Sequence, residues 1–319
     1  MKKRTKIIMS ILCILVVLLC AGGLFAGNML YNLALNPNSD KSTVFKADHN
    51  SMTDVKMPDE EERKKAKEWY SSADVQDDTM VSRDNLKLHG LKVEQEGNLW
   101  AVICHGYGGE AAQNTTSAYR FYQQGYNILM PDARGHGDSE GDYIGMGWDD
   151  RLDIVDWIQR ILEEEPESEI VLYGVSMGAA TVMMVSGEEL PENVKVIVED
   201  CGYTSVWGEF SYQLKMIFGI PSFPAMNFAS LVTKVRAGWW LGEGSAVKQV
   251  EKSKTPMLFI HGDADTFVPS FMLDEVYDAA NVEKEKLLVE GAGHGGSSGI
   301  LGDEYWNTVF SFIDKYVER

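Results

Sequence analysis

A pentapeptide in the middle of the chain holds a residue type suited to nucleophilic chemistry. Gly174 and Gly178 flank Ser176 in the pattern G-x-S-x-G, which often marks the nucleophile of a serine hydrolase. A serine hydroxyl is a poor nucleophile at neutral pH, so a base must take its proton and an acid must orient that base. The pattern therefore has meaning only where a histidine and a carboxylate can reach the serine.

The same pattern surrounds two other serines, Ser139 and Ser297, and the flanking sequence separates the three. A strand-like run, "EIVLYG", precedes Ser176, and a helix-like run, "MGAATVMMVSGEE", follows it. Such a context lifts a serine above the strand end and points helix N–H groups toward it. Ser139 lies in a polar turn and Ser297 in a Gly/Ser loop, so we predict Ser176 as the nucleophile.

The base and the acid are predicted from chain order and from their positions after strand-like runs. His294 lies in "GAGHGG", beyond the last strand-like run, and is the only histidine after the acid candidates. The order serine, acid, histidine is the one expected where a strand–serine–helix turn carries the nucleophile. We predict His294 as the general base and Asp265 as the acid, with Asp200 and Asp263 as alternative acids.

Two backbone N–H groups are predicted to hold the oxyanion that forms when the serine attacks. One belongs to Met177, which follows the nucleophile, and the other to Tyr107 in the glycine-rich loop "HGYGG". His105 and His261 each end a strand-like run, so either could line the site. We interpret both as residues that shape their own loops.

Short apolar runs alternate with helical patterns over most of the chain, and this alternation predicts an α/β fold. The strand-like runs are Trp100–Cys104, Tyr126–Met130, Ile170–Tyr173, Val194–Val198, Met257–Ile260 and Lys286–Val289. The helix-like segments are 58–71, 111–124, 148–164, 177–188, 270–280 and 303–316. The prediction is a mostly parallel central sheet with helices on both faces.

One long segment, from Tyr203 to Val250, interrupts the alternation and is rich in aromatic residues. A structureless loop of that length is improbable in a compact domain. We predict a helical cap inserted at about 203–250. Its aromatic side chains either line an apolar acyl pocket or pack within the cap itself.

The N-terminus differs in kind from the rest of the chain. "MKKRTK" is basic, and the next 25 residues, Ile7 to Tyr31, carry no charge, which is enough to span a bilayer as a helix. We predict an anchor at 1–31 with its basic end in the cytoplasm, a tether at 32–57, and an extracytoplasmic domain at 58–319. The alternative is a signal peptide cleaved near Ala21-Gly22-Gly23, which would leave a secreted protein.

The net charge of −19 excludes nucleic acid as an expected partner, because a phosphate backbone needs a basic surface. Two of the four cysteines, Cys13 and Cys20, lie in the apolar N-terminal run. Cys104 and Cys201 lie at predicted strand ends, where a buried free thiol is expected, although an exported domain can form disulfides.

Five motifs in order, "HGYGG", "DARGHGDSEG", "GVSMGA", "HGDADTFVP" and "GAGHGG", resemble the α/β-hydrolase superfamily over about residues 75–319. Within it, the chain looks like bacterial membrane-anchored serine hydrolases related to acyl-protein thioesterase-like and cinnamoyl-ester-hydrolase-like groups. The resemblance implies a Ser176–Asp265–His294 triad, an acyl-enzyme intermediate and no cofactor. It also implies scaffold roles for Asp132, Arg134 and His136.

The expected function is that of a serine hydrolase acting on a carboxylic ester or thioester. The expected partner is a small-molecule or lipid-like acyl substrate, with no cofactor and no metal. A peptidase, amidase or acyltransferase using the same three residues is the alternative. A non-catalytic surface protein on a hydrolase fold is a third hypothesis, and its signature would be the loss of a triad member.

Overall fold

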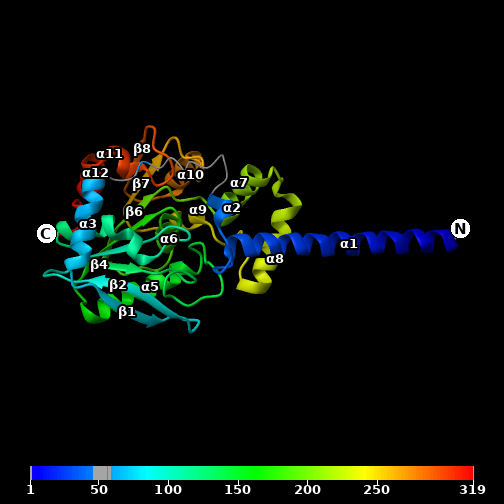
Figure 1. Ribbon diagram of the computed structural model, residues 1–319, viewed down its shortest axis with the longest axis horizontal. Helices are drawn as coiled ribbons and strands as arrows, with labels where there is room; N and C mark the ends of the chain where they lie inside the picture. The colour runs from blue at the N-terminus through cyan, green and yellow to red at the C-terminus, as the bar shows by residue number, and fades with distance from the viewer. Residues whose placement is uncertain (1, 46–55, 57–58, 319) are drawn as a thin grey trace.

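The computed structural model describes residues 2–45, 56 and 59–318, and an eight-stranded sheet forms its centre (Figure 1). The strand order is β1-β2-β4-β3-β5-β6-β7-β8. The hairpin β1–β2 and the pair β2–β4 are antiparallel, and all other neighbours are parallel, which confirms the predicted mostly parallel sheet. The strands are β1 Gln76–Val81, β2 Lys87–Val93, β3 Leu99–Cys104, β4 Asn127–Pro131, β5 Glu169–Val175, β6 Val194–Asp200, β7 Met257–Gly262 and β8 Lys284–Val289.

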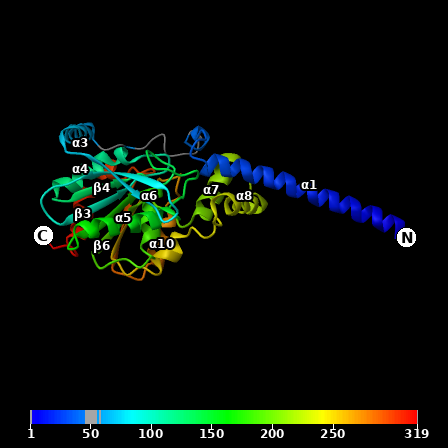
Figure 2. The same ribbon diagram turned by 90° about the horizontal axis from the view of Figure 1, so that it is seen from below.

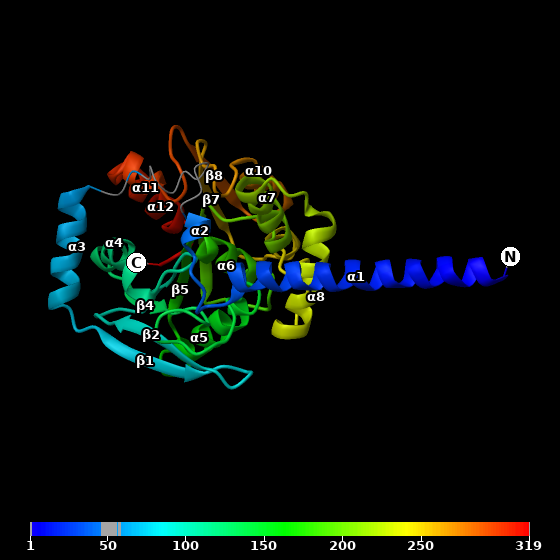
Figure 3. The same cartoon turned by 45° about the vertical axis from the view of Figure 1, so that its right-hand side comes forward.

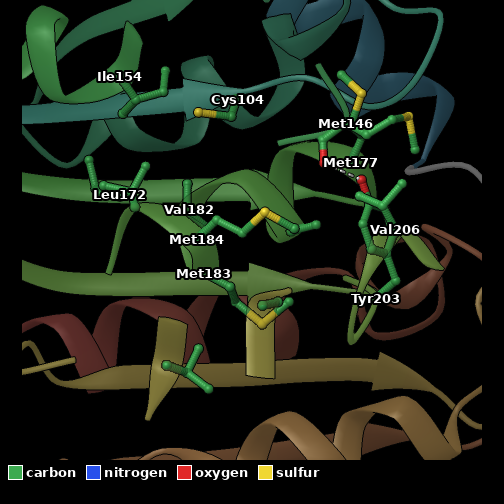
Figure 4. Close-up of a cluster of buried hydrophobic side chains, with 14 of the residues drawn as sticks. Cys104, Met146, Ile154, Leu172, Met177, Val182, Met183, Met184, Tyr203 and Val206 are labelled. Carbon is green, nitrogen blue, oxygen red and sulfur yellow. Dashed lines mark hydrogen bonds between the residues drawn. The ribbon is translucent and has the colours of Figure 1, made fainter. Parts of the chain in front are cut away.

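Helices cover both faces of this sheet because successive strand residues point to opposite sides. In β3, Trp100 and Val102 enter one buried cluster, whereas Ala101 and Ile103 enter the other. The first cluster, part of which is shown in Figure 4, is completed by α5 (Asp150–Glu164), α6 (Met177–Val185), α9 (Ala246–Val250) and α10 (Phe271–Ala279). The second is completed by α3 (Glu60–Ser72), α4 (Thr115–Gln123), α11 (Ser297–Leu301) and α12 (Asp303–Ile313), and the 3₁₀ turn η2 (Ala111–Asn114) precedes α4.

The register of the parallel strands brings their carboxyl ends to one edge of the sheet. Cys104 of β3 pairs with Gly174 of β5, and Val175 pairs with Asp200 of β6. β7 lies next to β6 and ends at Gly262. The loops that follow these four strands therefore meet above the same edge.

The predicted cap consists of two helices, α7 (Val206–Phe218) and α8 (Ser222–Ala237), which lie between β6 and β7 in the chain. An isolated antiparallel bridge between Ser205 and Ser245 closes the base of this insertion. The short helix α9, inside the predicted 203–250 range, packs instead against α6 and α10. The part that stands above the strand ends is therefore 206–244, and we call it the cap below.

The N-terminal helix α1 (Lys2–Leu35) is longer than the predicted anchor, and its last turns belong to the folded domain. Residues 4–22 are exposed and extend away from the body on the cap side, in both views (Figures 1 and 2). From Gly23 onward the helix packs against α8, which crosses it steeply (Figure 3), and Tyr31 and Leu35 are buried in the first cluster.

The predicted boundary at residue 31 therefore falls inside a continuous helix. The reason is that the apolar side chains of its last turns find partners in the cap, so the chain stays helical where a tether was expected. The chain continues through α2 (Ser42–Phe45), and the rest of the predicted tether, 46–55 and 57, lies outside the described residues.

Candidate active site

Ser176 occupies a strained turn between β5 and α6. Its backbone has φ 59° and ψ −120°, a conformation that costs a non-glycine residue on the order of 1–3 kcal/mol. The flanking glycines make the turn possible by their lack of a side chain. A Cβ on Gly174 would lie 2.2 Å from the Gly178 carbonyl oxygen, and one on Gly178 would lie 2.1 Å from that of Cys104. The pentapeptide is thus a packing requirement of the turn that presents the Ser176 hydroxyl.

Ser176, His294 and Asp265 form one hydrogen-bonded chain. His294 Nε2 lies 2.8 Å from Ser176 Oγ, and His294 Nδ1 lies 2.7 Å from Asp265 Oδ2. A carboxylate only accepts, so Nδ1 carries the ring proton and Nε2 accepts from the serine hydroxyl. The three predicted residues are brought together in an arrangement suited to moving a proton off the serine.

The Asp265 carboxylate is held by more than His294. Its Oδ1 accepts from the backbone N–H groups of Phe267 (2.9 Å) and Val268 (3.0 Å), and His261 Nε2 lies 3.3 Å from Oδ2. Burial alone would raise the pKa of the Asp265 carboxyl, but the charges and hydrogen bonds of His294 and His261 outweigh burial and hold that pKa at about 2. Asp265 therefore remains ionised and fixed in position. His261, interpreted from sequence as a loop-shaping residue, also contacts the acid.

The alternative acids and serines have other partners. Asp200 accepts from Tyr305 Oη (2.9 Å) and Ser297 Oγ (3.1 Å), and Asp263 accepts from the Gly291 N–H (2.7 Å). Ser139 donates to the Asp132 carbonyl oxygen (2.8 Å). Each of these groups stabilises a loop.

The loop after β3 passes directly beside the serine. A Cβ on Gly106 would lie 3.5 Å from Ser176 Cβ, which places the N–H of Tyr107 near the reacting group. Met177 is the first residue of α6, where N–H groups have no intrahelical partner. Within residues 59–318 and 2–45, neither the Tyr107 nor the Met177 N–H donates to another protein group. Both predicted donors therefore remain available to an oxyanion.

Tyr107 also has a role that the sequence did not indicate. Its hydroxyl donates to the carbonyl oxygen of Ala34 in the last turn of α1 (2.7 Å), and its ring lies 5.9 Å from that of Phe45. The end of α1 thus holds the loop that carries an oxyanion donor. Sequence spacing has no signal for a contact between positions 34 and 107.

The residues of "DARGHGDSEG" hold the loops next to the site in place through hydrogen bonds. Arg134 makes two 2.8 Å hydrogen bonds to Asp153, and His136 Nε2 accepts from the Gly108 N–H (3.1 Å) in the loop of Tyr107. Asp132 accepts backbone N–H bonds from the loops on either side. Burial lowers the pKa of His136 to about 4, so its ring stays neutral and can accept that bond.

An apolar pocket opens above Ser176. Its base is formed by Ser176, Met177 and Tyr107, and most of the other lining residues come from α1, α7 and α8. Among the described residues that line it, Glu209 of α7 is the single acid, and its Oε2 has no hydrogen-bond partner. Burial raises the pKa of Glu209 to about 8, so this carboxyl is uncharged at neutral pH.

One group of potential metal ligands coincides with the relay. Donor atoms of Cys201, Asp265 and His294 lie within 4.8 Å of one another. Burial raises the pKa of the Cys201 thiol well above its usual value, and the other two side chains already hydrogen-bond each other. The set therefore suits proton transfer better than metal binding. Cys104 and Cys201 are both buried free thiols.

Comparison with known proteins places these features in context. A family model described as serine aminopeptidase, S33, matches residues 98–210, a range that includes Ser176 and ends before Asp265 and His294. The Bacillus subtilis protein YqkD is 25% identical over 215 residues, which cover 67% of this chain and 70% of that protein. The Saccharomyces cerevisiae membrane protein YNL320W is 24% identical, covering 74% of this chain and 78% of that protein.

A solved structure, that of the Pyrococcus furiosus esterase PF2001, resembles this fold with a TM-score of 0.62. The two are 23% identical over 77% of this chain and 93% of the esterase. At that identity the likeness shows a shared fold. The pocket is therefore interpreted from this chain's own residues.

Proposed function

We propose that this chain, which belongs to the α/β-hydrolase superfamily, is a serine hydrolase that cleaves carboxylic esters or thioesters. The observation that carries the proposal is the relay from Ser176 through His294 to Asp265, with distances of 2.8 and 2.7 Å. Two unpaired backbone N–H groups, those of Tyr107 and Met177, lie beside it. Together they supply a nucleophile, a base, an orienting acid and an oxyanion site.

The reaction follows from these positions. Ser176 Oγ attacks the acyl carbon while its proton passes to His294 Nε2, and the carbonyl oxygen gains negative charge between the two N–H groups. The bond to the leaving alcohol breaks as His294 returns the proton to it, leaving an acyl group on Ser176. Water then loses a proton to His294 and releases the acid.

The pocket favours an ester with an uncharged acyl group over a peptide with a free amino terminus. An ammonium group needs an ionised acid or several acceptors where it binds. Glu209, the single acid among the described lining residues, is kept uncharged at neutral pH by burial. The remaining walls are largely aliphatic and aromatic. Amide or peptide cleavage, which the description of the matched family names, is the second candidate.

A fluorophosphonate probe tests the nucleophile on the purified full-length protein. We expect covalent labelling of the wild type and none of Ser176→Ala, because Ser176 alone among the described serines has a histidine ring in hydrogen-bond contact with its hydroxyl. Ser139→Ala is the matched control, since Ser139 occupies the same pentapeptide pattern and its hydroxyl hydrogen-bonds to the backbone of His89 and Asp132. Labelling that survives in Ser176→Ala would reject the assignment, and an unlabelled wild type would favour a non-catalytic protein.

We also propose that α1 anchors the protein in a membrane with the catalytic domain on the extracytoplasmic side. Arg4–Leu35 is the single helix among the described residues long and apolar enough to cross a bilayer, and a basic segment precedes it. The mass of the mature chain and its digestion by protease added outside intact cells test this. A chain that starts after Gly23 would support a secreted protein.

A further inference from the structure

Two of the pocket walls above Ser176 are formed by α1 and by the end of α7, and both segments also reach the surface of the molecule. Leu30, Leu33 and Ala34 of α1 line one side, and Ile217 and Phe218 at the end of α7 line another. Phe218 is also 43% exposed, so the lining reaches the molecular surface at that point. A continuous apolar path therefore connects the serine with the outside of the cap.

The cap is fixed against α1 by very close helix packing. A Cβ on Gly23 would lie 2.3 Å from the ring of Phe228, and one on Gly27 would lie 2.6 Å from the Phe228 backbone. Further along, Arg236 donates to the side chains of Asn28 and Asn32. The two helices cross steeply (Figures 1 and 3), and the contacts place the first half of α8 nearer Gly23 and its last turn nearer Asn32. The turn that precedes α8 is therefore on the side of the exposed, N-terminal part of α1.

The depth of this turn follows from the length of a membrane span. About 20 helical residues cross the hydrocarbon core, and counting from Ile7 they end at Ala26. Gly23 then lies near the outer edge of the core, and Phe228, which packs on it, lies at the same level. The turn between α7 and α8, residues 218–224, comes just before Phe228 in the chain, and because α8 crosses α1 steeply the turn lies near the same level.

The exposed side chains of the α7–α8 turn are of the kind expected at a membrane surface. Phe218, Ile220 and Phe223 are all exposed, Phe223 by 77%. The 33 residues from Phe210 to Gly242 hold no acidic residue and three basic ones, whereas the chain as a whole has 48 acidic residues in 319, or about five per stretch of this length. Exposed apolar side chains flanked by basic ones favour an anionic lipid surface, which an acidic surface would repel.

From these contacts we propose that the α7–α8 turn lies in the outer surface of the membrane that carries α1, and that the pocket takes an acyl chain directly from that bilayer. The substrate class is a membrane-resident lipid ester, with one acyl chain between α1 and the cap and its ester carbonyl at Ser176. Hydrolysis breaks the acyl C–O bond, adds water across it, and releases a fatty acid and an alcohol. The inference rests on the proposed serine-hydrolase function and specifies its substrate.

The experiment uses the full-length protein reconstituted in anionic lipid vesicles, with two esters. One is p-nitrophenyl butyrate, which reaches the site from water. The other is 1-palmitoyl glycerol at a fixed mole fraction in the bilayer. The variant Ile220→Asp/Phe223→Asp charges the turn at residues that do not line the pocket. Val81→Asp and Phe271→Asp charge equally accessible apolar residues on other faces and serve as matched controls.

We expect the double variant to hydrolyse the bilayer ester at least about tenfold more slowly, because two aspartates oppose insertion of the turn into an anionic surface. Its rate on the soluble ester stays within about twofold of wild type, which also shows that it folds. Both control variants match wild type on both esters. Equal rates of the double variant and wild type on the bilayer ester overturn the inference, whether or not the oligomeric state of the variant changes.

Failure of the underlying function gives a different result. If wild type hydrolyses neither ester, the serine-hydrolase proposal itself fails. If wild type hydrolyses only the soluble ester, the hydrolase assignment stands and the membrane-fed substrate is rejected.

Discussion

Ser176 faces two walls that are built by different means. The polar wall consists of His294, Asp265 and the loop of Tyr107, and its groups are positioned by hydrogen bonds of 2.7 to 3.0 Å. The apolar wall consists of the pocket-lining residues of α1, α7 and α8, and side-chain packing positions it. In the proposed reaction, the polar wall acts on the reacting atoms and the apolar wall receives the acyl group. The chemical step and the choice of substrate are therefore separable in this molecule.

The largest expected effect comes from the polar wall. Asp265→Asn removes the charge that keeps the His294 proton on Nδ1, so we expect kcat to fall by on the order of 10³–10⁴, equally for short-chain and long-chain esters. Steady-state kinetics on both esters measure this. Asp263→Asn is the control, because Asp263 contacts the Gly291 N–H instead of the base. Similar losses in the two variants would reject Asp265 as the acid.

A smaller and substrate-dependent effect is expected from the apolar wall. Gly27→Val forces the α8 backbone away from α1, and we expect a loss of about tenfold for long-chain esters and much less for short ones. Gly22→Val is the matched control, since a Cβ on Gly22 meets no atom within 4 Å. If the two variants behave alike, docking of α1 on the cap has no part in substrate choice.

The sheet, and the residues that the structure brings together at its edge, could be predicted because each follows a local pattern. The glycines around Ser176 are required by the turn itself, and the "KLLVEGAGHGG" run places His294 just beyond a strand. A residue that follows a strand in a βα repeat lies at the carboxyl edge of the parallel sheet. The repeat alone therefore predicts that Ser176, Asp265 and His294, which follow three different strands, lie at the same edge.

The apolar wall could not be predicted, because apolar side chains suit a bilayer and a protein core equally well. The sequence assigns Tyr31 to the anchor and Leu35 to the tether, although both are core residues. Gly23 was interpreted as part of a weak cleavage site, whereas Gly23 and Gly27 allow α8 to approach the helix. The G-x-x-x-G spacing of Gly23 and Gly27 indicates close packing against another helix, but it does not show that this helix is α8.

Tyr107 offers a test of how far the two walls are coupled, since it lies in the polar wall and hydrogen-bonds to Ala34 of α1 in the apolar wall. Tyr107→Phe keeps the ring and the backbone N–H but removes the hydrogen bond to Ala34 of α1. We expect the free energy of unfolding to fall by about 1 kcal/mol and kcat to fall a few-fold on both esters. Denaturant unfolding and kinetics measure the two effects. Tyr119→Phe, which alters an exposed hydroxyl, should change neither, and unchanged kcat in Tyr107→Phe would mean that the walls act independently.

The smallest effect on catalysis is expected at Glu209, where the apolar wall holds its one acid. The pKa of Glu209 is raised from 4.5 to about 8 in the folded protein, mainly by burial. Between these values the folded state keeps a proton that the unfolded state has lost, so stability falls as pH rises, by up to about 1.4 kcal/mol per pH unit. Above pH 8 this dependence ends.

Glu209→Gln removes that titration while keeping an oxygen to accept from Gln213. The free energy of unfolding of the variant should therefore rise relative to wild type as pH goes from 5 to 8, with kcat on the soluble ester nearly unchanged. Other buried carboxyls titrate in both proteins and cancel in the difference. A difference that stays constant with pH would mean that Glu209 is ionised in the folded state. The apolar wall would then hold a charge that could bind an amino terminus, and the choice between ester and peptide would reopen.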